Sequence, residues 1–254
     1  MSNEYLDLAV SAAKAAGEYL RLRTDIHVEA DEAHDIKLST DRDSERIILE
    51  TLAPSKLSVL AEESGEVGGN SKLRWIIDPL DGTVNYFKGA DDLSCVSIAL
   101  FDGDDPVLGV VNRFAVNELF VGVVGQGAFL NGEPIYASCV AKLSDAILAT
   151  GFSNIHKHTE DSMSRFIEYT RQVKKVRMLG SAALMGTFVA CGRFDIYYEE
   201  DIRLWDVAGA MAIVRSAGGA ARLEQHPNDE LFRCVFASAA TEGLLEEFEH
   251  AKSV

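Results

Sequence analysis

The segment from Trp75 to Thr83 constrains the fold and the function more than any other part of this sequence. It reads Trp-Ile-Ile-Asp-Pro-Leu-Asp-Gly-Thr, so a branched apolar strand delivers two carboxylates, Asp78 and Asp81, three residues apart. We expect Pro79 to end the strand between them. Two acids at the end of a buried strand lose hydration and repel each other, which is tolerated chiefly where a divalent cation neutralises both.

Gly82 and Thr83 extend this segment in a way that predicts phosphate binding. They look like the opening of a helix, whose free N–H groups and positive dipole end bind phosphate. The competing interpretation is that Asp78-Pro79 and Asp81-Gly82 are simple turns, because an isolated Asp-Gly pair is common turn chemistry. Taken alone, the segment favours the turns.

Acidic residues at the ends of three other predicted elements change that balance. Asp41 lies at the start of a predicted helix, Glu62 follows the predicted strand 57–61, and Asp206 lies at the start of another predicted helix. Each one alone is ordinary, since Asp is a common residue at a helix entrance. Together with the two aspartates above, they indicate one shared site where metal and phosphate meet.

The remaining pattern predicts a layered α/β protein. Apolar spacing predicts helices at 4–23, 41–52, 160–172, 181–191, 205–217 and 242–250, and strands at 57–61, 73–77, 95–101, 107–114, 118–123, 146–150, 175–178, 194–198, 220–223 and 235–237. We expect Thr40 to cap the second helix and Asn131-Gly132 to form a turn. An antiparallel meander therefore precedes a region of alternating strands and helices. We expect a boundary near residue 140, between an N-terminal half (1–140) and a C-terminal half (141–254).

Composition and charge argue against several other classes of protein. With 254 residues and 47% hydrophobic content, the chain can bury a large core without disulfides. Its net charge of −16, with no cluster of Lys and Arg among aromatics, argues against direct binding of nucleic acid. Its apolar runs are too short to span a membrane and its start has no signal sequence, so we expect a cytoplasmic protein. The four cysteines form no C-x-x-C pair, which argues against a zinc, redox or disulfide framework.

At these motifs the chain closely resembles the inositol monophosphatase family of lithium-sensitive, magnesium-dependent phosphatases, over nearly its full length. The resemblance is carried by Asp35 to Glu45, Ala61 to Ser64, Asp78 to Thr83, Gly180 to Ala183, Trp205 to Gly209 and Ala217 to Gly219. It implies an αβαβα sandwich of the inositol monophosphatase and fructose-1,6-bisphosphatase type, with an antiparallel sheet in the first half and a mixed sheet in the second. It also implies a homodimer.

The resemblance implies a set of metal ligands, with two or three Mg²⁺ ions in each active site. By motif, the first ion is bound by Glu62, Asp78 and the carbonyl oxygen of Leu80. The second is bound by Asp78, Asp81 and Asp206, and a third, weaker ion shares Glu62.

The resemblance also assigns residues to water and to substrate. It implies that Asp41 and Thr83 orient and help to deprotonate a metal-bound water, with Glu62 as a further catalytic residue. It implies that Gly82 and Thr83 hold the phosphate through their N–H groups and that Glu199 binds sugar or cyclitol hydroxyls. The implied substrate-binding set is Asp81, Gly82, Thr83, Ser181, Ala182, Glu199 and Asp206.

The implied chemistry agrees with the general behaviour of magnesium. A bound ion lowers the pKa of its water, and two ions on the order of 4 Å apart neutralise the transferring phosphoryl group and the leaving alkoxide. No protein nucleophile is required, so a chain without a suitable Ser/His/Asp or Cys/His pattern can still be a phosphatase. The haloacid dehalogenase mechanism is excluded by spacing, because the acids here stand in D-x-x-D and not in D-x-D.

Two positions depart from these expectations or compete with them. Many family members carry a basic residue eleven positions before the Asp of the Thr-Asp pair, where this chain has Ala30, and Lys37 is not equivalent by spacing. His156 and His158 could suggest a metal pair, yet an H-x-H in a polar loop is more often solvated surface.

The substrate remains open within the enzyme interpretation. Inositol monophosphate is our first expectation because Glu199 favours a polyhydroxylated substrate. Fructose 1,6-bisphosphate follows, and histidinol phosphate and 3′(2′),5′-bisphosphate nucleotides are further alternatives. An alternative of another class is a metal-binding regulatory or interaction protein with vestigial catalysis.

Overall fold

The computed structural model describes residues 3–23, 27–32, 35–69, 71–152, 160–225 and 233–252. Its helices are α1 (Asn3–Leu22), α2 (Ser39–Leu52), α3 (Thr83–Phe87), α4 (Glu160–Gln172), α5 (Ala182–Ala190), α6 (Leu204–Ser216) and α7 (Glu242–Lys252), with a 3₁₀ turn, η2, at Asp91–Leu93. Among the residues described, every helix is too short or too polar to cross a bilayer. The histidines of the predicted loop, His156 and His158, lie outside the described residues.

The first sheet has eight strands in the order β10-β9-β8-β7-β6-β5-β3-β4. They are β3 (Ser58–Ala61), β4 (Gly65–Val67), β5 (Leu73–Asp81), β6 (Cys95–Asp102), β7 (Asp105–Arg113), β8 (Glu118–Val123), β9 (Gly127–Leu130) and β10 (Glu133–Ile135). The predicted meander is confirmed from β6 to β8. The sheet is antiparallel except for β3 and β5, which run parallel with Ala61 opposite Ile77. This exception brings the carboxyl ends of both strands to the same edge of the sheet.

The second sheet is mixed, as expected, and has the order β12-β11-β13-β15-β14. Its strands are β11 (Ile147–Thr150), β12 (Lys175–Arg177), β13 (Ile196–Arg203), β14 (Ala220–Gln225) and β15 (Arg233–Ala239). A separate hairpin of β1 (Val28–Glu32) and β2 (Asp35–Leu38) was not predicted, and Ala30 lies in its first strand. The expected boundary near residue 140 falls between the two sheets, and its meaning as a division into halves stays a prediction.

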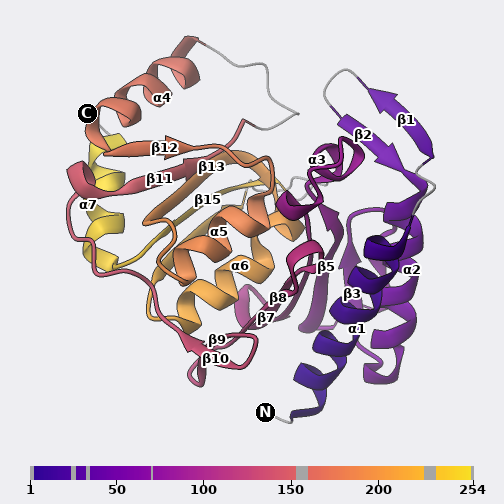
Figure 1. Cartoon of the computed structure of the whole chain (residues 1–254). Coiled ribbons are helices and arrows are strands. Elements are labelled where there is room, and N and C mark those ends of the chain that lie inside the picture. Colours follow the sequence, from indigo (N-terminus) through magenta and orange to yellow (C-terminus); the bar gives the residue numbers. More distant parts are fainter. Residues whose placement is uncertain are drawn as a thin grey trace.

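The elements stack in five layers, which confirms the αβαβα sandwich (Figure 1). Helices α1 and α2 cover one face of the first sheet, α5 and α6 lie between the two sheets, and α4 and α7 lie on the far side of the second. Side chains alternate accordingly along β5, where Trp75 and Ile77 pack toward α1 and α2, and Ile76 packs toward α5 and α6. Asp78 and Asp81 lie at the end of β5 and Asp206 at the start of α6, so the first sheet and the central helix layer both carry predicted site residues.

Two glycines allow α6 to lie against the first sheet. A Cβ atom added to Gly109 in β7 would lie 2.3 Å from the carbonyl oxygen of Gly209 and 2.9 Å from the Cβ of Ala212, both in α6. A Cβ added to Gly209 would in turn lie 2.5 Å from the Oγ of Ser97 in β6. Only residues without side chains fit this close approach of helix and strand, and α6 therefore packs directly on β6 and β7.

Two local predictions are wrong. Strand β5 does not end at Pro79 but continues to Asp81, with an irregularity in its pairing to β6 between Asp78 and Asp81. A bulge leaves one hydrogen bond of the ladder unmade. A proline, which has no backbone N–H to donate, is therefore tolerated there. Thr40 does not cap the second helix, because that helix already begins at Ser39. Thr40 is fully buried inside its first turn.

Candidate active site

The parallel pairing of β3 and β5 brings Glu62 beside Asp78. Leu60 and Ile76 are register partners that face α6, and the two acids continue these rows by two residues. Glu62 shares a hydrogen bond with Asp78, and Asp78 is only 2% exposed.

The bulge in β5 orients Asp78. Its Oδ1 accepts a hydrogen bond from the backbone N–H of Leu80 at 3.0 Å, and the carbonyl of Pro79 accepts one at 2.8 Å from the hydroxyl of Ser44 in α2. Burial raises the pKa of Asp78 well above its usual range, and the negative charges of Glu62 and Asp81 raise it further. The bulge thus aims a strongly desolvated carboxyl group toward the centre of the fold.

Asp81 closes the N-terminus of α5. Its carboxylate accepts hydrogen bonds from the Ser181 hydroxyl at 2.6 Å, from the N–H of Ala183 at 2.7 Å and from the N–H of Ala182 at 3.3 Å. The sulfur atom of Cys95 lies 3.8 Å from Oδ2 of the same carboxylate. Burial raises the pKa of Asp81 to about 6, although these donors pull it down. A residue of the first sheet is thereby joined to the helix layer.

Asp206 reaches the same place from the start of α6. It lies in the first turn of the helix, where its Oδ2 accepts a hydrogen bond from the N–H of Arg203 at 3.0 Å. Burial raises the pKa of Asp206 well above its usual range, and the negative charges of Glu62 and Asp81 raise it further. The structure therefore brings together the four carboxyl groups that the sequence predicted for one site.

The donor chemistry of this group suits a hard divalent cation. Its members supply only carboxylate oxygens, and their mutual repulsion in a desolvated place favours a positive charge among them. In the described part of the chain, however, no three His, Cys, Asp or Glu side chains form a ready-made metal cage. The carboxylate of Asp81 is turned to α5, and the carbonyl of Leu80 accepts a hydrogen bond from the Thr83 hydroxyl at 3.0 Å. These predicted ligand atoms therefore already accept hydrogen bonds, and the carbonyl of Leu80 keeps a second lone pair for a cation.

Asp41 and Thr83 also meet, from α2 and α3. The Thr83 hydroxyl lies 3.1 Å from Oδ1 of Asp41, and Oδ2 of Asp41 accepts a hydrogen bond from the N–H of Leu38 at 3.2 Å. Because a hydroxyl has one proton, Thr83 donates either to Asp41 or to the carbonyl of Leu80. Asp41 is 3% exposed, and burial raises its pKa to about 7. A carboxyl group with this pKa can accept a proton near neutral pH.

Gly82 turns the chain into α3, as the sequence predicted. It has φ +86°, and a Cβ atom there would lie 2.7 Å from the carbonyl oxygen of Leu93 in η2, so a glycine is needed on both grounds. Its own carbonyl accepts hydrogen bonds from the N–H of Tyr86 and the hydroxyl of Ser94, both at 3.0 Å. Because α3 has only five residues, its dipole is small. The prediction of phosphate binding here therefore depends on the backbone of the turn and not on a helix dipole.

Glu199 lies on β13 in the second sheet, 8% exposed, and it has two neighbours that the sequence did not single out. The hydroxyl of Tyr197 donates to its Oε2 at 2.9 Å, and a Cβ at Gly151 would lie 2.4 Å from the same atom. Burial raises the pKa of Glu199 to about 7. The spacing of two along a strand could have indicated Tyr197, since such residues share a face.

Glu45 is a further residue whose contribution the sequence did not reveal. It is 3% exposed in α2, and its carboxylate accepts hydrogen bonds from the N–H of Glu63 at 2.9 Å and from the hydroxyl of Ser64. These bonds fix the chain directly after Glu62. Glu45 therefore holds in place the segment that carries one of the four clustered acids.

Known proteins share the sequence pattern and the fold of this chain. The model of the inositol monophosphatase family matches residues 1–252. Inositol monophosphatase 3 of Solanum lycopersicum is 41% identical over 228 residues, covering 85% of this chain and 84% of its own length. The Nus factor SuhB of Xylella fastidiosa is 37% identical over 227 residues, covering 86% and 82%. The solved structure of an inositol monophosphatase from Anabaena (Nostoc) sp. PCC 7120 superposes with a TM-score of 0.85 at 34% identity, covering 98% of this chain and 95% of its own.

Proposed function

Because the chain belongs to the inositol monophosphatase family and is a phosphoric monoester hydrolase, we propose that it releases phosphate from an inositol monophosphate with the help of Mg²⁺. The observation that carries this proposal is the convergence of Glu62, Asp78, Asp81 and Asp206 on one desolvated place from β3, β5 and α6. Such a concentration of carboxyl groups is costly for folding and is typical of a functional site.

The residues that would hold Mg²⁺ are these four carboxylates and the carbonyl of Leu80. When bound, the ions supply a water of lowered pKa and positive charge beside the phosphoryl group. The side chains of Asp41 and Thr83 are suited to orient the attacking water, because the Thr83 hydroxyl can accept its hydrogen bond while donating to Asp41. A proton that leaves the water can then rest on Oδ1 of Asp41, with Glu62 as a further catalytic group.

The substrate would lie between the first sheet and α5. Gly82 and Thr83 would hold the phosphate through their N–H groups, in a turn that η2 supports from behind. Ser181 and Ala182, at the start of α5, and the carboxylate of Glu199 would face the alcohol part, where the partly charged Glu199 can accept hydrogen bonds from ring hydroxyls. Asp81 and Asp206 would contact both cation and substrate. This division favours a polyhydroxylated alcohol over a plain one.

A panel of phosphate monoesters tests both the reaction and the substrate. We expect phosphate release from inositol 1-phosphate with Mg²⁺, no release after chelation, and inhibition by lithium and by excess Ca²⁺. Fructose 1,6-bisphosphate, histidinol phosphate and 3′-phosphoadenosine 5′-phosphate serve as comparisons. Equal rates on all compounds would refute the choice of inositol monophosphate, and full activity in the chelated sample would refute the use of a metal.

A binding role beside catalysis is the second candidate, because one group of relatives carries the name Nus factor SuhB. Such a role would work through protein partners, since the net charge of −16 disfavours direct contact with nucleic acid. We also propose a cytoplasmic homodimer. Light scattering on the purified protein tests the dimer, and an inactive Asp81→Asn variant that retains partner binding would separate the two roles.

A further inference from the structure

The side-chain amide of Asn85 joins two parts of the fold that are distant in sequence. Its Nδ2 atom lies 2.9 Å from the carbonyl oxygen of Leu93, 2.8 Å from that of Leu179 and 3.2 Å from that of Gly180. All three neighbours are hydrogen-bond acceptors, so the NH₂ group and not the oxygen must face them. Asn85 lies in α3, Leu93 in η2, and the other two in the loop that leads into α5.

The first of these bonds supports the turn at Gly82. The carbonyl of Leu93 is the atom that packs against Gly82, at the distance that leaves no room for a Cβ. The hydroxyl of Ser94, the next residue, donates to the carbonyl of Gly82. Asn85 therefore holds η2 against the turn at Gly82.

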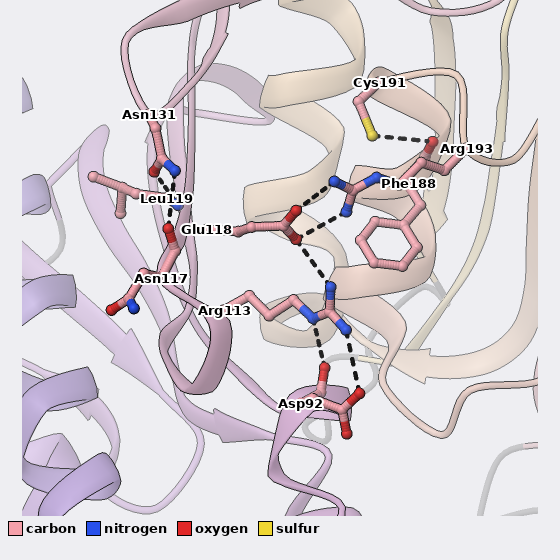
Figure 2. Close-up of polar contacts among 9 residues, drawn as sticks. All are labelled: Asp92, Arg113, Asn117, Glu118, Leu119, Asn131, Phe188, Cys191 and Arg193. Carbon is pink, nitrogen blue, oxygen red and sulfur yellow. Dashed lines mark hydrogen bonds and ion pairs between the residues drawn. The ribbon is translucent and has the colours of Figure 1, made fainter.

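A second anchor, Arg113, also holds η2. Arg113, at the end of β7, donates to the carbonyl of Asp92 at 2.5 Å and forms an ion pair with its carboxylate at 3.5 Å (Figure 2). The same guanidinium group donates to Glu118 of β8 at 2.9 Å. Because η2 is fixed to the first sheet by these contacts, the hydrogen bond from Asn85 ties α3 to a firm support.

The other two bonds fix the approach to α5. Gly180 has φ +71°, and a Cβ atom there would lie 3.3 Å from the Asn85 amide, so this loop packs directly on the side chain. The next residue is Ser181, which is the N-cap of α5 and donates to the carboxylate of Asp81. A shift of the loop would move Ser181 and Ala182 relative to the turn at Gly82.

We propose that Asn85 is a positioning residue that sets the distance between the Gly82–Thr83 turn and the Ser181–Ala182 start of α5. This rests on the proposed function, in which the turn holds the phosphate and the start of α5 faces the alcohol. By joining the two through one amide, Asn85 aligns the two ends of the substrate with the reacting atoms. Misplacement on the order of 1 Å can lower a rate about a hundredfold.

The test compares two Asn→Asp changes of equal size. Asn85→Asp replaces the donor by a carboxylate that faces three carbonyl oxygens. Asn131→Asp is the matched control, because the Asn131 amide lies in the turn after β9 and bonds, among the residues described, only to the backbone of Asn117 and Leu119 at the start of β8 (Figure 2). We expect kcat/KM for inositol 1-phosphate with Mg²⁺ to fall about tenfold to a hundredfold in Asn85→Asp, and less than twofold in Asn131→Asp. Asn85→Ser replaces Asn85→Asp if that variant does not fold.

A double-mutant cycle separates positioning from a general loss of stability. Each Asn variant is combined with Ser181→Ala, and kcat/KM is corrected for the folded fraction measured by urea unfolding. We expect the effects of the Asn85 and Ser181 changes on kcat/KM to be non-additive by fivefold or more, because both changes act on the start of α5. The effects of the Asn131 and Ser181 changes should be additive. An active wild type with additive effects at Asn85 overturns the positioning role alone. A wild type that releases no phosphate overturns the proposed function, and the positioning role with it.

Discussion

Substituting Gly109 by alanine should loosen the contact between α6 and the first sheet. The added Cβ would lie 2.3 Å from the carbonyl oxygen of Gly209 and 2.9 Å from the Cβ of Ala212, whereas an ordinary contact begins at 3.4 Å. Helix and strand must therefore separate by about 1 Å, since neither obstacle is the flexible end of a side chain. Overpacking of this kind costs about 1 to 3 kcal/mol of unfolding free energy.

Urea unfolding followed by circular dichroism measures this loss, and thermal unfolding should show a midpoint lower by about 2 to 12 °C for a chain of this length. Gly243→Ala in α7 is the control, because a Cβ there meets nothing within 4 Å. Alanine should stabilise that helix by up to about 1 kcal/mol. Activity of Gly109→Ala should fall as well, because α6 carries Asp206. If Gly109→Ala has the same urea midpoint as the wild type, the glycine is not needed for the close approach of α6 to the sheet.

Three further predictions concern single side chains. Asp81→Asn should abolish phosphate release while the protein stays folded without metal, because the loss of a desolvated charge offsets the bonds that an amide nitrogen cannot accept from Ser181 and Ala183; a variant that is unfolded in buffer would contradict this. Tyr197→Phe should raise the pKa of Glu199, because its hydrogen bond lowers that pKa, and an unchanged carboxyl titration in NMR spectra would refute it. Glu118→Gln should cost about 1 kcal/mol at pH 7. The ion pairs with two arginines lower the pKa of Glu118, so its stabilisation is present above the unfolded pKa and is lost as pH falls through the folded one. Urea midpoints of both proteins should therefore converge in acid, and a constant difference would refute the ion-pair account.

The sequence indicated the acids of the site because each stands next to a strong local signal. Asp78 and Asp81 follow an apolar strand, and Asp206 begins an apolar helix, so their places depended only on nearby residues. The meeting of these acids could be expected only from their number and from the family resemblance. Contacts between residues far apart in sequence arise from packing, which local patterns do not encode.

The errors have the same origin. Nothing near Pro79 signals that the pairing of β5 with β6 becomes irregular there and lets the strand continue. Ser39 and Thr40 are both typical caps, yet the helix begins before either can act as one, because Leu38 is the N-cap and the Asp41 side chain accepts a hydrogen bond from its N–H. The support that Glu45 gives to residues 63 and 64, and that Asn85 gives to Gly180, spans different elements. A single sequence offers no signal for such pairs.

The central position of α6 has a consequence for synthesis of the chain. The ribosome releases Glu62, Asp78 and Asp81 more than a hundred residues before Asp206. Until α6 arrives, the face of the first sheet that includes Ile76 and Phe120 has no cover from that helix and stays open to water. The nascent protein therefore passes through a stage in which an apolar face of the sheet is exposed and the acidic site lacks Asp206. Chaperones would have most to protect at this stage.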